Sequence, residues 1–201
     1  MSALFERLKR LFDEGHCAPL PDLHDDARFA PPELRPAAVL IAVTERDEPG
    51  VLLTHRPGTM RQHAGQVAFP GGKLDPGEDA IAAALREAEE ELALTPSAIR
   101  IIGASDRFVT VTGYDVTPVL AVLPPDLPIV PNPAEVADWF EAPLHHLLDP
   151  ANHVQKRGEW KGRQRAYIEI TWQGHVIWGV TAAIIANLSR RLAWQELVGG
   201  S

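Results

Sequence analysis

Apolar and polar positions recur along the chain with two different periods, and these periods predict the secondary structure. Residues 2–14 and 79–92 carry apolar side chains every three or four positions, which is typical of amphipathic helices. The apolar runs 37–44 and 51–54 flank a turn at 46–50, so they are predicted to form a hairpin of buried strands. The same reasoning predicts strands at 66–69, 99–109, 115–123, 136–141, 165–172 and 175–178, a short helix from Pro143, and a helix over 180–194.

The order of these elements predicts the fold class. Strands dominate, one strong helix lies in the centre and helices lie at both ends, which favours an α+β domain with helices packed on a mixed central sheet. A length of 201 residues suits one such domain. Prolines at positions 19, 21, 31, 32 and 36 indicate an extended connector. We therefore predict an N-terminal helix with connector over 1–35 and a main domain over 36–201.

Composition and charge exclude several classes of function. The 27 acidic residues outnumber the 19 basic ones, so no basic surface for broad nucleic-acid binding is expected. The single Cys17 excludes an intramolecular disulfide and fits a cytoplasmic location. The charged first residues lack the apolar core of a signal peptide, and no apolar stretch is long enough to span a bilayer. We expect neither a nucleic-acid nor a membrane partner, and the oligomeric state stays open.

Acidic residues are densest over 71–94, which includes the predicted helix 79–92. Glu87, Glu90 and Glu91 are spaced to share one helical face, where like charges repel each other. A divalent cation would reverse that repulsion, since Mg²⁺ binds carboxylates together with substrate phosphates. The helix pattern alone is equally typical of a solvated face. A second face is predicted to pack on the sheet: Ile81, Leu85, Ala88 and Leu92.

The spacing of residues around this helix distinguishes a metal-binding face from a solvated one. Gly72 is followed after five residues by Glu78, and after seven more by Arg86-Glu87-Ala88-Glu89-Glu90-Glu91. This arrangement resembles the Nudix box, with two departures: Ala88 is small where a larger aliphatic residue is usual, and Ala93 replaces a glycine. The resemblance implies a Nudix-like α/β/α sandwich with terminal helical additions. It also implies an enzyme that hydrolyses a nucleoside diphosphate linked to another group.

The same resemblance implies roles for individual residues. Glu87, Glu91 and Glu90 would bind Mg²⁺ or Mn²⁺, with the Gly71 carbonyl as a further ligand. Arg86 would hold a glutamate carboxylate through its planar guanidinium, and it joins the three glutamates in the predicted catalytic group. Which carboxylate acts as the general base stays open.

A second signature lies directly upstream, over 52–72. Its sequence, LLTHRPGTMRQHAGQVAFPGG, resembles the motif of the coenzyme A pyrophosphatase subgroup of Nudix hydrolases. This implies a small-molecule substrate, coenzyme A or a derivative, cleaved to 3′,5′-ADP and 4′-phosphopantetheine. Four residues would form the substrate-binding segment. Arg56 and Arg61 would bind phosphate oxygens, Gly65 would shape the loop and Phe69 would fill the core.

Several alternatives stay open. The substrate could instead be another nucleoside diphosphate derivative, such as a sugar conjugate or a dinucleotide, or the protein could be a non-catalytic sensor on the same fold or an acidic protein-interaction module. Glu135 is either an additional metal ligand or base, or an exposed loop residue. A basic cluster either meets the 3′-phosphate of coenzyme A or forms a solvated hairpin tip: Lys156, Arg157, Lys161, Arg163 and Arg165. The segments 132–136 and 178–182 are more loosely similar to the same subgroup.

Overall fold

The computed structural model describes residues 2–58, 65–160 and 163–193. Its helices are α1 (Ala3–His16), α2 (Ala80–Leu92), α3 (Leu144–Leu148) and α4 (Val180–Arg191). Its strands are β1 (Arg35–Thr44), β2 (Gly50–His55), β3 (Val67–Ala68), β4 (Gly71–Lys73), β5 (Arg100–Ala104), β6 (Phe108–Val109), β7 (Tyr114–Leu123), β8 (Asp138–Pro143), β9 (Val154–Trp160), β10 (Arg163–Trp172) and β11 (His175–Trp178). Three short 3-10 helices complete the described part, at Ala27–Phe29, Pro96–Ala98 and Pro150–Asn152.

The central sheet is mixed and is built around β1. This strand runs parallel to β7 along its whole length and antiparallel to β2 and β4. The strand order is β3-β2-β1-β7-β5, with β4, β6 and β8 added beside β1, β7 and β2. A second antiparallel sheet has the order β11-β10-β9. Because β1 is apolar on both sides, both faces of the central sheet must be covered.

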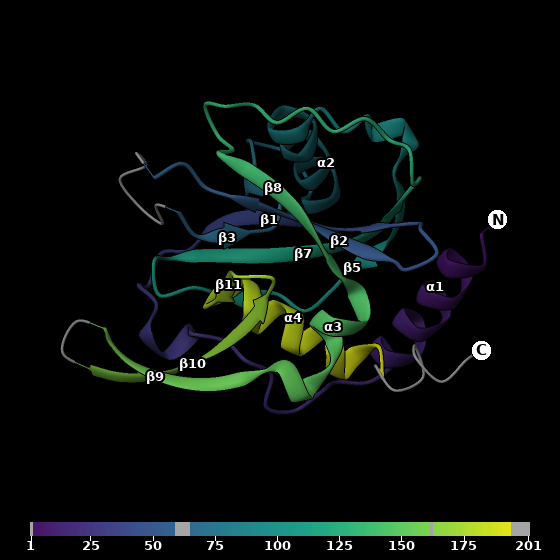
Figure 1. Ribbon diagram of the computed structural model, residues 1–201. Coiled ribbons are helices and arrows are strands. Elements are labelled where there is room, and N and C mark those ends of the chain that lie inside the picture. Colours follow the sequence, from purple (N-terminus) through teal and green to yellow (C-terminus); the bar gives the residue numbers. More distant parts are fainter. Residues whose placement is uncertain (1, 59–64, 161–162, 194–201) are drawn as a thin grey trace.

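Two hydrophobic cores cover those two faces, and helices lie on both sides of the central sheet (Figure 1). On one face, the small side chains Ala83, Ala84 and Ala88 let α2 pack closely against the sheet. On the other face lie α1, α3, α4 and the second sheet. The expected α+β class and α/β/α layering are therefore confirmed. We call these two sides the α2 face and the α4 face.

Several sequence predictions about the elements are wrong in detail. Ile81 is 36% exposed, because the face of α2 that packs on the sheet is formed by the smaller alanines instead. The predicted strand 99–109 is two strands, β5 and β6, and the register of β5 against β7 shifts between Ile101 and Gly103. No strand was predicted over Val154–Trp160, where charged residues obscure the pattern, yet it forms β9.

The N-terminal helix shares the core of the α4 face. Its buried residues Leu8, Leu11 and Phe12 pack in the same cluster as the apolar residues of α4. The division into 1–35 and 36–201 stays a prediction, and the predicted connector contains one 3-10 turn, Ala27–Phe29. Within the described residues, no helix has the length and apolar character needed to cross a membrane.

Candidate active site

Capping residues define where the helix α2 begins and ends, and so determine which of its side chains face the sheet. Asp79 caps its first turn by accepting a hydrogen bond from the Ala82 amide at 2.8 Å. Its last residue is followed by Ala93, whose φ of 55° lies in the left-handed region that glycine prefers. The register between these ends turns Glu87 and Glu91, which are one helical turn apart, toward the glycines of β4.

Two glycines let the backbone of β4 approach these carboxylates. A Cβ atom at Gly72 would lie 2.3 Å from the Glu87 Oε1 atom, and a Cβ atom at Gly71 would lie 2.3 Å from the Ala38 carbonyl oxygen. The Gly71 amide donates a hydrogen bond to Glu91 Oε2 at 3.3 Å. Gly71 therefore requires glycine, because a side chain there would meet the backbone of β1, whereas a side chain at Gly72 would displace the Glu87 carboxylate.

A third acidic residue reaches the same place from a distant loop. Carboxylate oxygens of Glu87, Glu91 and Glu135 all lie within 4.8 Å of one another. The Val130 and Asn132 amides donate to the carbonyls of Leu92 and Glu91, at 2.9 and 2.8 Å. Those carbonyls belong to the last turn of α2 and have no partner within the helix. This attachment carries Glu135 to the site, a placement that the sequence left open.

The electrostatics of this three-acid group are unfavourable in the protein alone. Burial raises the pKa of Glu91 to about 8, against the opposing influence of the nearby Arg56 guanidinium. Burial also raises the pKa of Glu87. Three close carboxylates are the oxygen donor set that a hard divalent cation prefers, and such a cation would compensate their repulsion. The residues present therefore fit Mg²⁺ or Mn²⁺.

Arg86 organises the acidic residues beside the group. Its Nε and Nη2 atoms each donate to the Glu78 carboxylate at 3.0 Å, which is the planar fork expected from the sequence. Its Nη1 atom donates to Glu87 at 3.0 Å and to Glu90 at 3.2 Å. The hydrogen bonds between Arg86 and Glu78 lower the pKa of Glu78 and raise the pKa of Arg86. Arg86 thus fixes the orientation of Glu87.

Glu90 is placed differently from the other two predicted ligands. Its side chain is half exposed, pairs with Arg86 and does not belong to the three-acid group found among the described residues. Its role as a metal ligand stays a prediction, as does that of the Gly71 carbonyl.

The upstream segment forms a hairpin that leads to the same site. Arg56 follows β2, donates its amide to the Gln66 carbonyl at 3.0 Å and accepts at its own carbonyl from the Gly65 amide at 3.1 Å. Gly65 has a φ of 70°, so it does shape the turn. Phe69 is buried in the core of the α4 face, as the core-filling expectation requires; contact with substrate stays a prediction. The predicted phosphate-binding residue Arg61 lies outside the described residues.

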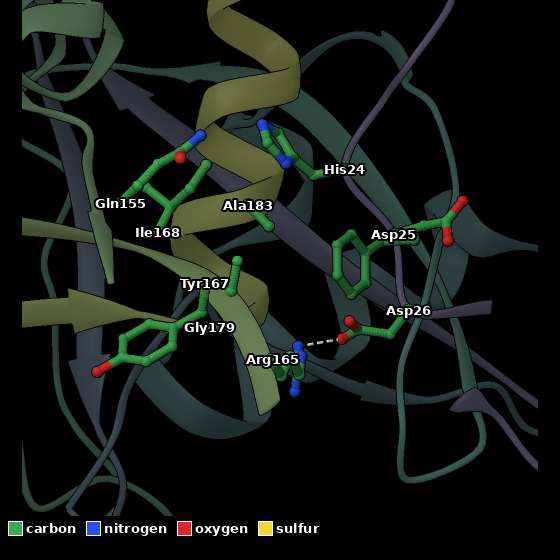
Figure 2. A pocket seen from close by; sticks show the side chains of 11 residues that line it. His24, Asp25, Asp26, Gln155, Arg165, Tyr167, Ile168, Gly179 and Ala183 are labelled. Carbon is green, nitrogen blue, oxygen red and sulfur yellow. Dashed lines mark hydrogen bonds and ion pairs between the residues drawn. The ribbon is translucent and has the colours of Figure 1, made fainter. Parts of the chain in front are cut away.

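The basic cluster is partly neutralised by acidic residues. Arg165 bonds to the buried Asp26 in a pocket that the core residues Phe108 and Ala183 also line (Figure 2). That pocket lies on the α4 face, whereas the three-acid group lies beside α2. Lys156 pairs with Glu169 at 3.6 Å. Lys161 lies outside the described residues. Two members of the cluster thus already have acidic partners, and the choice between a 3′-phosphate contact and a solvated hairpin tip stays open.

The fold and the site together define a class of protein. The structure has a mixed sheet between helices, with paired glycines facing glutamates on a single helix, and the chain matches the NUDIX domain family over residues 34–163. The chain belongs to the Nudix family. Its members act on pyrophosphate bonds of nucleoside diphosphate derivatives with the help of divalent metal ions.

Particular relatives support this assignment. The chain is 45% identical over 167 residues to a protein of Cronobacter sakazakii described as the uncharacterized Nudix hydrolase NudL, and the match covers 79% of this chain and 83% of that protein. A protein of Escherichia coli K12 with the same description is 45% identical over 163 residues, with the same coverage. Among solved structures, the Nudix hydrolase RenU of M. smegmatis is 26% identical with a TM-score of 0.50, covering 57% of this chain and 74% of that one.

Proposed function

We propose that this Nudix hydrolase cleaves the diphosphate of coenzyme A or a derivative, giving 3′,5′-ADP and 4′-phosphopantetheine. One observation carries the proposal: the Arg56 guanidinium lies close enough to Glu91 to affect its pKa. The segment that resembles the coenzyme A signature thus brings a cation near the acidic group. The same segment continues into Gly71 and Gly72, which contact the acidic side chains.

In this proposal each residue has a distinct task. Glu87, Glu91 and Glu135 would hold Mg²⁺ or Mn²⁺, with Glu90 as a candidate further ligand. When bound, the metal would neutralise the diphosphate and lower the pKa of a coordinated water. Arg86 keeps the Glu87 carboxylate oriented, and Arg56 binds phosphate oxygens through its planar guanidinium. A carboxylate of the same group accepts the proton of the attacking water.

The test compares substrates that share a diphosphate and differ elsewhere. Coenzyme A, dephospho-coenzyme A, ADP-ribose and NADH are each incubated with the protein and Mg²⁺, and the products are separated by chromatography. We expect the highest kcat/KM with coenzyme A and both expected products. A higher kcat/KM with ADP-ribose or NADH would assign the site to another nucleoside diphosphate derivative.

A pair of arginine variants tests the observation itself. Arg56→Ala removes a charge-assisted phosphate contact and should lower kcat/KM about ten- to a hundredfold. Arg46→Ala is the matched control, since Arg46 pairs with Glu141 beside the β1–β2 turn. Equal effects of the two substitutions would contradict the role of Arg56.

A further inference from the structure

In the β2–β3 hairpin, which carries Arg56, the β3 arm has little support from the ladder between the two strands. β3 has only two residues, and its register with β2 consists of Thr54 with Ala68 and His55 with Val67. It lies at one end of the strand order of the central sheet. So short a ladder provides little stability by itself. β2 itself is held in the sheet, because it pairs with β8 along its whole length, from Gly50 with Pro143 to His55 with Asp138. The β3 arm of the hairpin therefore depends on contacts from outside the sheet.

The acidic group, by contrast, is held without the hairpin. Gly71 and Gly72 pair with Val39 and Ala38 of β1, and the Leu40 amide donates to the Pro70 carbonyl at 2.8 Å. These bonds anchor β4 directly to the centre of the sheet. The backbone facing the metal ligands is thus held by β1, whereas the β3 arm beside Arg56 has only its two-residue ladder with β2.

Two side-chain contacts from the segment after β10 reach the hairpin. The Thr181 hydroxyl, in the first turn of α4, donates to the Val67 carbonyl at 3.0 Å and is 7% exposed. The His175 Nδ1 atom, at the start of β11, lies 2.9 Å from His55 Nε2, and the His175 ring stacks on Phe140 with centroids 3.8 Å apart. β11 also lies against β3. Both contacts therefore join the second sheet and α4 to the hairpin.

The Thr181 bond meets a specific need of β3. The Gln66 carbonyl bonds toward β2, and successive carbonyls of a strand point in opposite directions. The Val67 carbonyl consequently points away from β2, where the chain is buried. A buried carbonyl requires a donor, and the Thr181 hydroxyl is that donor.

We infer that Thr181 and His175 are positioning residues that hold the β2–β3 hairpin so that Arg56 faces the acidic group. The inference rests on the proposed role of Arg56 in phosphate binding and deepens it. It also gives a physical role to the segment 178–182, whose similarity to the coenzyme A subgroup the sequence left without one.

The kinetic test compares two variants of Thr181, one that removes its hydroxyl and one that retains it. Thr181→Val keeps the shape of the side chain but loses the donor, and it should raise KM about tenfold with kcat and the metal-activation constant close to wild type. Thr181→Ser keeps the hydroxyl and should restore KM. Ser189→Ala is the matched control, because Ser189 is a buried α4 residue whose hydroxyl donates to the Leu148 carbonyl. It should leave KM unchanged.

A measurement independent of turnover separates this inference from the choice of substrate. Amide hydrogen exchange of residues 54–56 and 66–68 should be faster in Thr181→Val than in Ser189→Ala or wild type. If another nucleoside diphosphate derivative proves to be the substrate, the same variants are compared by their KM for that compound instead of their KM for coenzyme A. Unchanged exchange in the hairpin, or equal KM in Thr181→Val and Ser189→Ala, would overturn the inference.

Discussion

An arginine on each face of the central sheet binds carboxylates, but the balance of charge differs between the faces. On the α4 face, Arg191 donates to both oxygens of Asp106 at 2.7 Å and to the carbonyls of Gly15 and Ala18. The hydrogen bond from Arg191 holds the pKa of Asp106 below its ordinary value. On the α2 face, Arg86 is shared among several glutamates, and burial raises the pKa of Glu87 and Glu91.

The difference separates a structural ion pair from a site built for a ligand. One acid meets one arginine beside α4, so the charges are compensated within the protein. Beside α2 the acids exceed the arginines, and the excess negative charge can be relieved either by proton uptake, which the raised pKa values reflect, or by a bound cation. The raised carboxylate pKa values, together with the close approach of the three acids, make this group the candidate site.

The largest expected effect comes from removing the uncompensated acids. Glu87→Gln and Glu91→Gln should each lower kcat about a hundredfold or more, because each removes a ligand of the expected metal. Glu89→Gln is the matched control, since Glu89 is an exposed residue of the same helix. Steady-state kinetics at saturating Mg²⁺ measure the effect. Turnover near the wild-type value in either variant would exclude that residue as a key ligand.

Disrupting the ion pair between Arg191 and Asp106 should lower the stability of the protein without changing its catalytic rate. Asp106→Asn leaves the buried Arg191 without its counter-charge and should lower the free energy of unfolding by roughly 3 kcal/mol, with kcat unchanged. The folded pKa of Asp106 is lowered, so its contribution is present above its unfolded pKa of about 3.9 and is lost as pH falls through the folded value. Urea denaturation should therefore show the difference from wild type shrinking below about pH 4. A constant difference would contradict the assignment.

In the metal-free protein, the contribution of Glu91 to stability should depend on pH in the opposite direction to that of Asp106. Its folded pKa is about 8, above an unfolded value of about 4.3, so its contribution is present below about pH 4.3 and is lost as pH rises toward 8. Removing the charge by Glu91→Gln should then stabilise the chelator-treated protein by roughly 2 kcal/mol near pH 9, and less near pH 5. Thermal melts with and without Mg²⁺ measure this, and added Mg²⁺ should stabilise wild type more than the variant. A metal-free wild type equally stable at both pH values would contradict the prediction.

The smallest expected effect is a gain in stability from substitutions just after the C-terminal ends of α2 and α4. Ala93 and Ala193 have φ values of 55° and 43°, beyond α2 and α4 respectively. Glycine at either position should raise the free energy of unfolding by about 1 kcal/mol, because it has no Cβ to strain the left-handed backbone. Denaturant titration of Ala93→Gly and Ala193→Gly measures the gain. A loss of turnover in Ala93→Gly alone would show that this turn also shapes the site.

The sequence predicts well what is encoded locally. The helix 79–92 is observed as Ala80–Leu92, because its cap and its periodicity lie within the segment itself. The relation between Glu87, Glu91 and Arg86 follows from helical spacing, and the observed fork to Glu78 comes from the turn just before it. Family resemblance supplied the fold, which local patterns define only as a class.

Contacts between distant segments could not be predicted from the sequence. Glu135 reaches the site because backbone amides of its loop bond to the end of α2. Arg165 pairs with Asp26, far away in the sequence, so a run of basic residues gave no sign that one member is already neutralised. Ile81 illustrates a different failure: hydrophobicity alone does not select the helical face that packs, because alanines allow a closer approach.

The pairing of β1 with β7 also constrains how the chain acquires its fold during synthesis. Arg35 lies opposite Tyr114 and Thr44 lies opposite Leu123, in ten consecutive parallel pairs. The central pair of strands therefore cannot close until residue 123 has left the ribosome. Until then the β1–β2 hairpin exposes an apolar edge, a state in which chains aggregate. Pairing between segments so far apart also slows folding. Nascent chains truncated before β7 should consequently depend on chaperones more strongly than the full-length chain does.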